Sequence, residues 1–297
     1  MTLETIAVTG GNGKIGEAIL SHLNDHGYRT VNLARGKRRE EVSDEYRTTN
    51  LLNAGEVYGS LAASGADAII HMGTIPAPGS HPGHVVFESN VMSSYYVLEA
   101  ATQLELDAAC LASSINAMGS VYQDAPMEVY SLPVDEEHPL TPRDPYAMGK
   151  HALEVTADGF GRLPEPPQTI STLRYPWVAT GEELEEAVTD ADRSMEGLEE
   201  AWHHTTRDTL FSYVHIDDAA SIARKCVEAD FEGHERFWAV AGDTTAEVES
   251  DRLAETFYPD AEQRRSFDGT EGLIDISKAR ELLDWDPQRT WRDPSTL

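Results

Sequence analysis

Short apolar runs alternate with amphipathic stretches along the first half of the chain. Residues 5–8 and 108–112 are mostly apolar, and runs of about four to eight such residues suit strands buried on both faces. After the first run, apolar residues recur at helical spacing from Ile15 to Leu23. Strand and helix signals alternate up to about residue 162. This alternation predicts an α/β fold with a doubly wound parallel sheet and helices on both faces.

A cluster of prolines interrupts the alternation at residues 163–167 (Leu-Pro-Glu-Pro-Pro), and such a cluster ends regular structure. Beyond it, strand-like runs occupy residues 169–175 and 236–241, and an acidic, helix-like stretch lies between them. We therefore expect a first domain over residues 1–165. Residues 166–297 should supply the remaining strands of the sheet and a small C-terminal subdomain.

The turn between the first strand and the first helix is rich in glycine. From residue 9 to residue 16 it reads Thr-Gly-Gly-Asn-Gly-Lys-Ile-Gly. Glycines in such a turn let backbone N–H groups approach a pyrophosphate at the helix N-terminus. A glycine pattern alone is a weak signal, but its place between a strand and a helix predicts a Rossmann-type dinucleotide-binding domain. The cofactor-binding residues expected here are Gly10, Gly11, Asn12, Gly13, Lys14, Ile15 and Gly16.

Tyr146 and Lys150 are the outer residues of a Tyr-Ala-Met-Gly-Lys segment. Four residues apart on a helix, the two side chains share one face and can meet. A cation beside a phenol favours the phenolate, which can accept the proton of an alcohol. The spacing alone is common on amphipathic helices. It gains weight from the glycine-rich turn, from Ser113-Ser114 after an apolar run, and from Asn90 at the start of a helix-like stretch.

Ser114, Tyr146 and Lys150, together with the glycine-rich turn, resemble the short-chain dehydrogenase/reductase superfamily in its extended branch. The resemblance covers nearly the whole chain, because residues 67–73 and 276–287 also look like segments of that branch. It implies that the first domain binds NAD(P) and that the small C-terminal subdomain binds the substrate.

The resemblance also implies a role for each polar residue of the site. Tyr146 would take the hydroxyl proton of the substrate while hydride leaves the substrate carbon for the nicotinamide. Lys150 would lower the pKa of Tyr146 and bind the nicotinamide ribose. Ser114, which lies five residues before a glycine as in the family, would orient the reacting oxygen, and Ser113 is the alternative. Asn90 would support the loop near the cofactor or cap its helix. The further residues expected to contact the cofactor are Asn50, Leu51, Met72, Gly73, Thr74, Ser113, Tyr146, Lys150, Tyr175 and Pro176.

The densest basic run of the chain, residues 35–39 (Arg-Gly-Lys-Arg-Arg), follows the apparent second strand. NAD enzymes usually place an acidic residue at this strand end to hold the ribose 2′-hydroxyl. Here the position is Ala34, followed by Arg35, and an arginine suits a 2′-phosphate. With Arg35, Lys37 and Arg38 as contacts, the run predicts a preference for NADP, with NAD possible. The alternative is a solvated turn, the usual fate of charged runs.

Three positions separate this chain from the members of the branch that act on nucleotide-activated sugars. Those members carry an asparagine and an arginine where this chain has Trp177 and Phe211, and a tyrosine where it has Met118. The amide and the guanidinium would each contribute about 1.5–3 kcal/mol to holding a diphosphate. The resemblance therefore favours an oxidoreductase that converts the anomeric hydroxyl of a free aldose or uronate to a lactone. A nucleotide-sugar epimerase or dehydratase is the alternative.

The residues expected to bind the sugar are Ser114, Ile115, Asn116, Tyr146, Trp177 and His215. No metal is expected, because the chain's paired histidines lack the close spacing of metal ligands; these are His81, His84, His203 and His204. A non-catalytic dinucleotide-sensing protein of this fold is a third hypothesis. Such proteins typically lose the tyrosine or the lysine, and both are present here.

The chain carries 52 acidic and only 23 basic residues, which gives a formal net charge of −29. A field of that sign repels nucleic acid and anionic membranes, so neither is an expected partner. No apolar run approaches the ~20 residues of a membrane span, and 2 cysteines are too few for a disulfide framework. We expect a cytoplasmic protein that binds a small sugar, and the resemblance implies a homodimer or higher homo-oligomer.

The acidic residues are spread along the chain rather than gathered in one tail, as in proteins of salt-accumulating microbes. High salt screens the repulsion between such charges, so we predict a halophilic protein. The midpoint of thermal unfolding and the enzymatic activity should both rise between low salt and molar KCl. Full stability and activity without molar salt would contradict this prediction.

Overall fold

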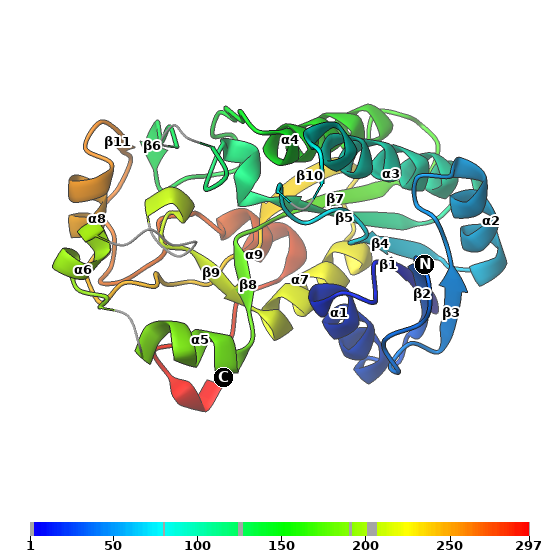
Figure 1. Cartoon of the computed structure of the whole chain (residues 1–297), viewed down its shortest axis with the longest axis horizontal. Coiled ribbons are helices and arrows are strands. Elements are labelled where there is room, and N and C mark those ends of the chain that lie inside the picture. The colour runs from blue at the N-terminus through cyan, green and yellow to red at the C-terminus, as the bar shows by residue number, and fades with distance from the viewer. Residues whose placement is uncertain (1–2, 80, 124–126, 190–191, 201–206, 297) are drawn as a thin grey trace.

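The computed structural model describes residues 3–79, 81–123, 127–189, 192–200 and 207–296. A sheet of seven strands crosses its centre, with helices on both faces (Figure 1). Every neighbouring pair in this sheet is parallel. The predicted doubly wound α/β architecture is therefore confirmed. From one edge to the other the strands are β3 (Glu45–Thr48), β2 (Arg29–Ala34), β1 (Thr5–Thr9), β4 (Ala68–His71), β5 (Ala108–Ser114), β7 (Thr169–Tyr175) and β10 (Gly233–Trp238).

Two helical layers cover the sheet. Alternate residues of a strand face opposite sides, so Ile6 and Val8 of β1 pack beneath one layer and Ala7 beneath the other. The helices of the first layer are α1 (Lys14–Asp25), α7 (Ile216–Glu228) and α9 (Ser277–Leu283). Those of the second layer are α2 (Ala54–Ser64), α3 (Gly83–Gln103) and α4 (Pro145–Phe160).

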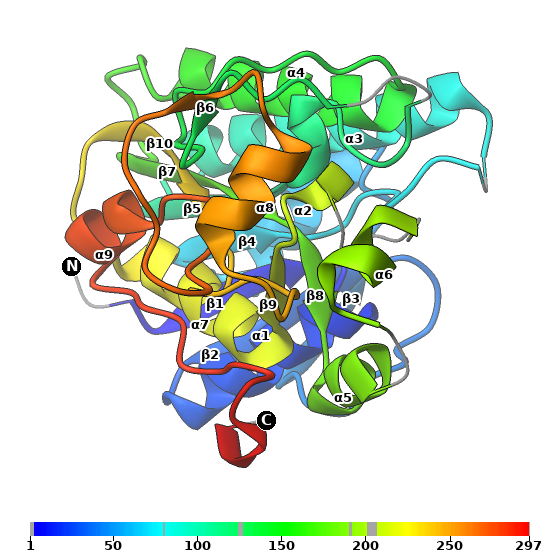
Figure 2. The same cartoon turned by 90° about the vertical axis from the view of Figure 1, so that its left-hand side faces the viewer.

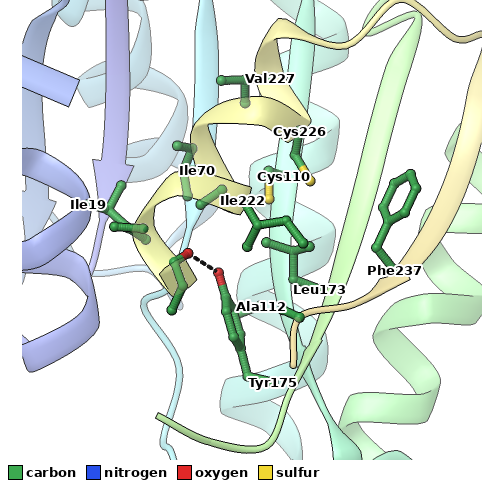
Figure 3. Close-up of a cluster of buried hydrophobic side chains, with 14 of the residues drawn as sticks. Ile19, Ile70, Cys110, Ala112, Leu173, Tyr175, Ile222, Cys226, Val227 and Phe237 are labelled. Carbon is green, nitrogen blue, oxygen red and sulfur yellow. Dashed lines mark hydrogen bonds between the residues drawn. The ribbon is translucent and has the colours of Figure 1, made fainter. Parts of the chain in front are cut away.

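Figure 3 shows part of the core beneath the first layer. Cys110 of β5 and Cys226 of α7 lie side by side there, and both are fully buried. Burial raises the pKa of the Cys110 thiol well above its ordinary value. Cys110 therefore acts as a small core residue, held as the neutral thiol.

A third apolar cluster lies outside the two layers, in the part of the molecule that faces the viewer in Figure 2. Ile115, Met118 and Leu132 pack there with Leu253 and Phe267. Segments from before and after the proline cluster thus build this subdomain together, and the division at residue 165 stays a prediction. The elements beyond the sheet and its layers are η1 (Ile115–Met118), β6 (Ser131–Leu132), β8 (Trp177–Ala179), α5 (Gly181–Thr189), α6 (Met195–Glu200), η2 (Arg207–Thr209), β9 (Tyr213–His215), α8 (Ser250–Phe257), β11 (Glu262–Gln263) and η3 (Pro294–Thr296).

The boundaries of α3 and β10 differ from the predicted ones. α3 begins at Gly83 rather than at Asn90, so Asn90 lies about two turns inside the helix and does not cap it. The residue at the N-cap position, Pro82, offers no side-chain cap, so the usual polar start signal was missing from the sequence. β10 ends at Trp238, before the predicted end at Ala241.

Candidate active site

The order of the strands reverses between β1 and β4. From β1 the chain continues outward to β2 and β3, and it returns at β4 on the other side of β1. Ligands of open α/β sheets bind in the crevice outside the strands' carboxyl ends at such a switch point. A cavity of about 850 Å³ opens there, which we call the cofactor cleft. The predicted residues that line it are Gly10, Asn12, Gly13, Lys14, Ile15, Gly16, Arg35, Leu51, Met72, Gly73 and Thr74.

The glycine-rich turn packs directly against the loop after β4. Gly10 has a φ of +71°, and a Cβ there would lie 2.8 Å from the Cα of Gly73. A Cβ on Gly16 would lie 2.4 Å from the carbonyl oxygen of Gly10. Only glycine allows these approaches. Gly13 has no side chain to cap α1, so the first N–H groups of that helix are available to an anion. The residues therefore fit a dinucleotide pyrophosphate.

Gly11 and Lys14 make contacts within the protein that do not involve a cofactor. A Cβ on Gly11 would lie 2.6 Å from the side chains of Asn32 and Leu20, so this glycine is required by packing. The Lys14 ammonium donates to the carbonyl oxygen of Val178 at 2.8 Å and to Glu183 at 2.7 Å. It therefore links the glycine-rich turn to the β8–α5 segment.

A buried chain of hydrogen bonds holds the loop after β4. Thr9 Oγ1 accepts the N–H groups of Met72 at 3.1 Å and Gly73 at 3.0 Å, and it lies 2.7 Å from His71 Nδ1. Having accepted twice, the Thr9 hydroxyl can donate to Nδ1, which puts the proton of His71 on Nε2, 3.1 Å from Ser93 Oγ. Burial, followed by the charge of Lys150, lowers the pKa of His71 to about 3, so the ring is neutral.

The side-chain amide of Asn90 supports the same loop. Its Nδ2 donates to the carbonyl oxygens of Ile75 at 3.2 Å and Val86 at 2.9 Å. The neighbouring Ser89 hydroxyl accepts the N–H of Ile75 at 3.2 Å. Asn90 is fully buried, so the structure places it behind the cofactor loop.

A second cavity of about 340 Å³ adjoins the first, and we call it the catalytic cavity. The two share Ile15, Met72, Thr74 and Pro76 in their walls, so they lie side by side. The predicted residues that line the catalytic cavity are Ser113, Ser114, Ile115, Asn116, Tyr146, Lys150, Tyr175, Pro176 and Trp177.

The three central polar residues meet in this cavity. The Lys150 ammonium donates to the carbonyl oxygen of Ala112 at 2.8 Å and to Thr74 Oγ1 at 3.2 Å, and it lies 5.5 Å from the centre of the Tyr146 ring. The Tyr146 phenol is hydrogen-bonded with Ser114. The serine hydroxyl also accepts the backbone N–H of Asn116 at 3.1 Å and its side-chain Nδ2 at 3.2 Å. A hydroxyl proton could therefore pass between substrate, serine and phenol.

The start of α4 fixes the position of Tyr146 along the helix. Asp144 is the N-cap, and its Oδ1 accepts the N–H groups of Tyr146 at 2.9 Å and Ala147 at 3.0 Å. Pro145 follows at the first helical position, where its fixed φ suits the helix and its missing N–H costs nothing. Tyr146 thus stands in the first turn, and Lys150 in the next.

Burial dominates the proton affinities of the pair. It raises the pKa of Tyr146 strongly, and the hydrogen bond with Ser114 lowers it in part. It lowers the pKa of Lys150 to about 7, against a smaller opposing effect of Glu154. A low dielectric disfavours both charged forms, the phenolate and the ammonium. Efficient proton transfer at neutral pH therefore needs additional positive charge beside the phenol.

Three residues named from the sequence have other hydrogen-bond partners than expected, and two of them, His215 and Asn50, do not line either cavity. His215 is buried at the N-cap of α7, where its Nδ1 accepts the N–H of Asp217 at 3.2 Å. The Ser113 hydroxyl donates to Glu154 at 2.6 Å, so of the two serines Ser114 is the one bonded to the phenol. Asn50 is exposed and accepts the N–H of Leu52.

Phe211 and Met118 are core residues of the subdomain. Both are fully buried in its apolar cluster, and the Phe211 ring meets Phe257 edge to face with centres 5.1 Å apart. The chain therefore has an apolar contact at the position where the resemblance would require a guanidinium.

The basic run after β2 divides into two groups. Arg35 and Arg39 line the cofactor cleft. Arg38 turns away and donates to the carbonyl oxygens of Glu40, at 2.8 Å, and Ser43. Asn12 ties the run to the glycine-rich turn, because its Oδ1 accepts the N–H of Arg39 at 3.0 Å. Arg39 was missed by the sequence interpretation, although it belongs to the same run.

Tyr122 and Thr209 also line the catalytic cavity and were not predicted. The Tyr122 ring meets the Tyr146 ring edge to face, with centres 5.8 Å apart and planes at 86°. Its position in an irregular loop gave no periodic signal. Thr209 follows residues 201–206, which lie outside the described part of the chain.

The described ranges contain no group of three or more His, Cys, Asp or Glu side chains that could hold a metal. His81 and His84 are exposed, whereas His203 and His204 lie outside those ranges. A search of the same ranges also finds no helix with the length and apolar character of a membrane span.

Comparison with known proteins identifies the class. Residues 6–241 match the model of the NAD dependent epimerase/dehydratase family, so the chain belongs to that family. A UDP-glucose 4-epimerase of Rhizobium meliloti is 25% identical over 97% of this chain and 94% of its own length. An NAD-dependent glucose-6-phosphate dehydrogenase of Haloferax volcanii is 28% identical over 39% of this chain and 45% of its own length.

Solved structures share the fold. MoeE5 in complex with UDP-glucuronic acid and NAD superposes with a TM-score of 0.69, at 18% identity, over 98% of this chain and 97% of its own. A mutated uronate dehydrogenase superposes with a TM-score of 0.67, also at 18% identity, over 98% of this chain and 84% of its own. A protein bound to a nucleotide sugar and NAD and a uronate dehydrogenase therefore both have this architecture.

The buried ammonium of Lys150 should reduce stability in a pH-dependent way. Its folded-state pKa of about 7 lies below the ordinary 10.5. The loss of free energy of unfolding is therefore greatest below pH 7, and it disappears above about pH 10.5. Lys150→Met should therefore raise the free energy of unfolding by roughly 1–3 kcal/mol at pH 6 and by less at pH 9.5, measured by urea denaturation in molar KCl.

Lys225→Met is the matched control, because the Lys225 ammonium is paired with Asp284 at 3.2 Å near the surface. This variant should change stability little at either pH. A Lys150→Met protein that is equally destabilised at both pH values would show that the buried charge carries no such cost.

Proposed function

We propose that the protein is a nicotinamide-dependent oxidoreductase that oxidises the anomeric hydroxyl of a free sugar to a lactone. The observation that carries this proposal is the chemistry of the catalytic cavity. Lys150 is the one charged side chain among the described residues of its walls. A volume of about 340 Å³ lies at the small end of ligand pockets. These features favour a small neutral substrate over a nucleotide diphosphate.

The same chemistry favours an aldose over a uronate. A carboxylate is normally met by an arginine fork, a lysine ammonium or several N–H donors. The described walls offer only the Lys150 ammonium as a cation, and it already donates twice. Asn116, Tyr122 and Thr209 supply neutral polar groups for hydroxyls. Trp177 supplies an aromatic face on which a sugar ring can stack.

Each catalytic side chain has a defined task in this proposal. Ser114 hydrogen-bonds the reacting hydroxyl and holds it against Tyr146. The Tyr146 phenolate accepts the hydroxyl proton as the C=O bond forms. Lys150, fixed by Ala112 and Thr74, stabilises the phenolate and reaches the nicotinamide ribose. The bound cofactor supplies the hydride acceptor and, in its oxidised form, a positive charge that favours the phenolate.

A preference for NADP belongs to the same proposal. Ala34 leaves no carboxylate at the end of β2, and Arg35 and Arg39 both line the cleft beside it. Two guanidinium groups at that edge suit a 2′-phosphate. NAD remains a possible second cofactor, since proteins of this fold such as MoeE5 bind NAD.

A nucleotide-sugar epimerase is the second candidate. It is favoured by the curated relatives named UDP-glucose 4-epimerase, which match over nearly the whole chain. Against it stand Trp177 in the cavity wall and Phe211 in the core, where polar side chains would be needed.

The proposal also covers the cellular environment and the oligomeric state of the enzyme. The acidic composition and a relative from Haloferax volcanii support a halophilic cytoplasmic protein. A homodimer through α3 and α4 is supported by four exposed apolar side chains on those helices, which are Phe87, Tyr95, Met148 and Val155.

A substrate panel tests the reaction. Free pentoses, hexoses, uronates and nucleotide sugars are offered in molar KCl with NADP or NAD, and reduced cofactor is followed at 340 nm. We expect reduction with a neutral aldose and release of a lactone, and loss of at least about 10³-fold in kcat for Tyr146→Phe. Turnover of nucleotide sugars alone, without net cofactor reduction, would replace the proposal by the epimerase.

The cofactor preference is tested at Arg35. Arg35→Asp should move the ratio of kcat/KM values from NADP toward NAD by about 10- to 100-fold, because a charge-assisted contact is lost and a repulsive one is added. Lys37→Asp is the matched control, since this nearby cation does not line the described cleft. Equal effects of the two substitutions on this ratio would show that the preference comes from the overall charge of the basic run and not from a contact with Arg35.

A further inference from the structure

Glu154 is a buried carboxylate that the proposed reaction does not use directly. It lies on α4, one turn beyond Lys150 and two turns beyond Tyr146. Its exposed fraction is 0%, and it lies outside the described walls of both cavities. A buried charge of this kind is costly unless every lone pair is satisfied.

Four hydrogen bonds from three different strands satisfy it. Ser113 of β5 donates to Oε1 at 2.6 Å. Arg174 of β7 makes a two-pronged pair, Nε to Oε1 at 3.0 Å and Nη2 to Oε2 at 2.8 Å. Arg236 of β10 donates to Oε2 at 3.2 Å. One side chain of α4 is thus fastened to β5, β7 and β10 at once.

The contact at Ser113 leads directly to the catalytic serine. Ser113 is paired in register with Arg174, and Ser114 is paired with Tyr175. Ser113 holds β5 to Glu154, while Ser114, the last residue of β5, meets the Tyr146 phenol. The same carboxylate therefore fixes the last two residues of β5 relative to the helix that carries Tyr146 and Lys150.

A stable core does not by itself require this arrangement. Apolar residues of similar volume often replace a buried ion pair at no cost in stability, and Leu153 and Ala157 already pack α4 on the sheet through apolar contacts. The carboxylate fixes the orientation of α4 on the sheet. Apolar contacts allow small rotations of a helix, whereas a two-pronged charge pair does not.

We propose that Glu154 is the positioning residue of the active site: through Ser113 and Arg174 it sets the distance between Ser114 and Tyr146 and keeps the Lys150 ammonium over the phenol. The inference rests on the proposed oxidoreductase function. It concerns the geometry of the pair rather than the identity of the sugar.

Three substitutions in the full-length protein separate shape from charge. Glu154→Gln keeps the shape and removes the charge, and Glu154→Asp keeps the charge and shortens the reach. Ser113→Ala removes the hydrogen bond that links Glu154 to β5. The matched control is Ser171→Ala, because Ser171 is a buried serine of β7 whose Oγ has no hydrogen-bond partner.

The kinetic readouts are kcat, measured in molar KCl with sugar and NADP both saturating, and KM for NADP, measured by varying NADP at saturating sugar. In the kcat measurement the bound cofactor is counted to confirm full occupancy. Glu154→Asp and Ser113→Ala should lower kcat by about 10- to 100-fold with KM for NADP changed less than about threefold, since a displacement near 1 Å costs that much. Ser171→Ala should match the wild type.

The pH profile isolates the charge. Glu154 raises the pKa of Lys150, so its neutralisation in Glu154→Gln should move the apparent pKa of the Tyr–Lys pair, read from kcat against pH, to lower pH. Among the described residues, Arg174, Arg236, Asp158 and His234 are the other charged or titratable groups beside Glu154, and they are unchanged in the variant. Glu154→Asp should leave the pKa in place.

A readout without turnover keeps the inference independent of the substrate. Hydrogen exchange of the α4 amides, with NADP bound, should accelerate in Ser113→Ala and not in Ser171→Ala. If the wild type oxidises no free sugar, the proposed function fails, and exchange still decides the role of Glu154. Wild-type kcat, pH profile and exchange in a folded Ser113→Ala protein would overturn the inference, even if Glu154→Gln does not fold.

Discussion

Helix α4 is held on the sheet by a buried ion pair between Glu154 and Arg174, with 2.8 Å between Oε2 and Nη2. The pair is desolvated on all sides, and Ser113 and Arg236 complete the hydrogen bonds of the carboxylate. Successive turns of the same helix carry Lys150 and Tyr146, so the geometry of the catalytic cavity follows from where this pair sits. Burying the two charges costs desolvation free energy, and the arrangement gives the helix one orientation on its strands.

A second constraint is the distribution of charge. The chain carries 52 acidic residues against 23 basic ones, yet Arg35 and Arg39 line the cofactor cleft. An anionic dinucleotide therefore meets cations at a place where the remaining surface would repel it. In the adjoining catalytic cavity, Lys150 is the one charged side chain among the described residues of the walls. The two cavities therefore differ in charge.

The sequence predicted the sheet and the helices around it because these depend on local periodicity and on glycine at positions of close backbone approach. Helical spacing paired Tyr146 with Lys150, and the resemblance to the short-chain dehydrogenase/reductase superfamily added Ser114 to them. The sequence missed the start of α3, where Pro82 gives no side-chain cap, and it missed Tyr122, which lies in an irregular loop. Neither position carries a periodic pattern.

Periodicity and turn chemistry are properties of neighbours along the chain, so the sequence by itself determined the fold class, the glycine-rich turn and the spacing of the catalytic pair. The direction of a side chain depends on what packs against it from distant segments, and only the tertiary structure decided that. Trp177 and His215 belong to the paired strands β8 and β9, yet Trp177 lines the cavity while His215 caps α7. Ser113 and Ser114 are adjacent, and the buried Glu154 takes one hydroxyl while Tyr146 meets the other.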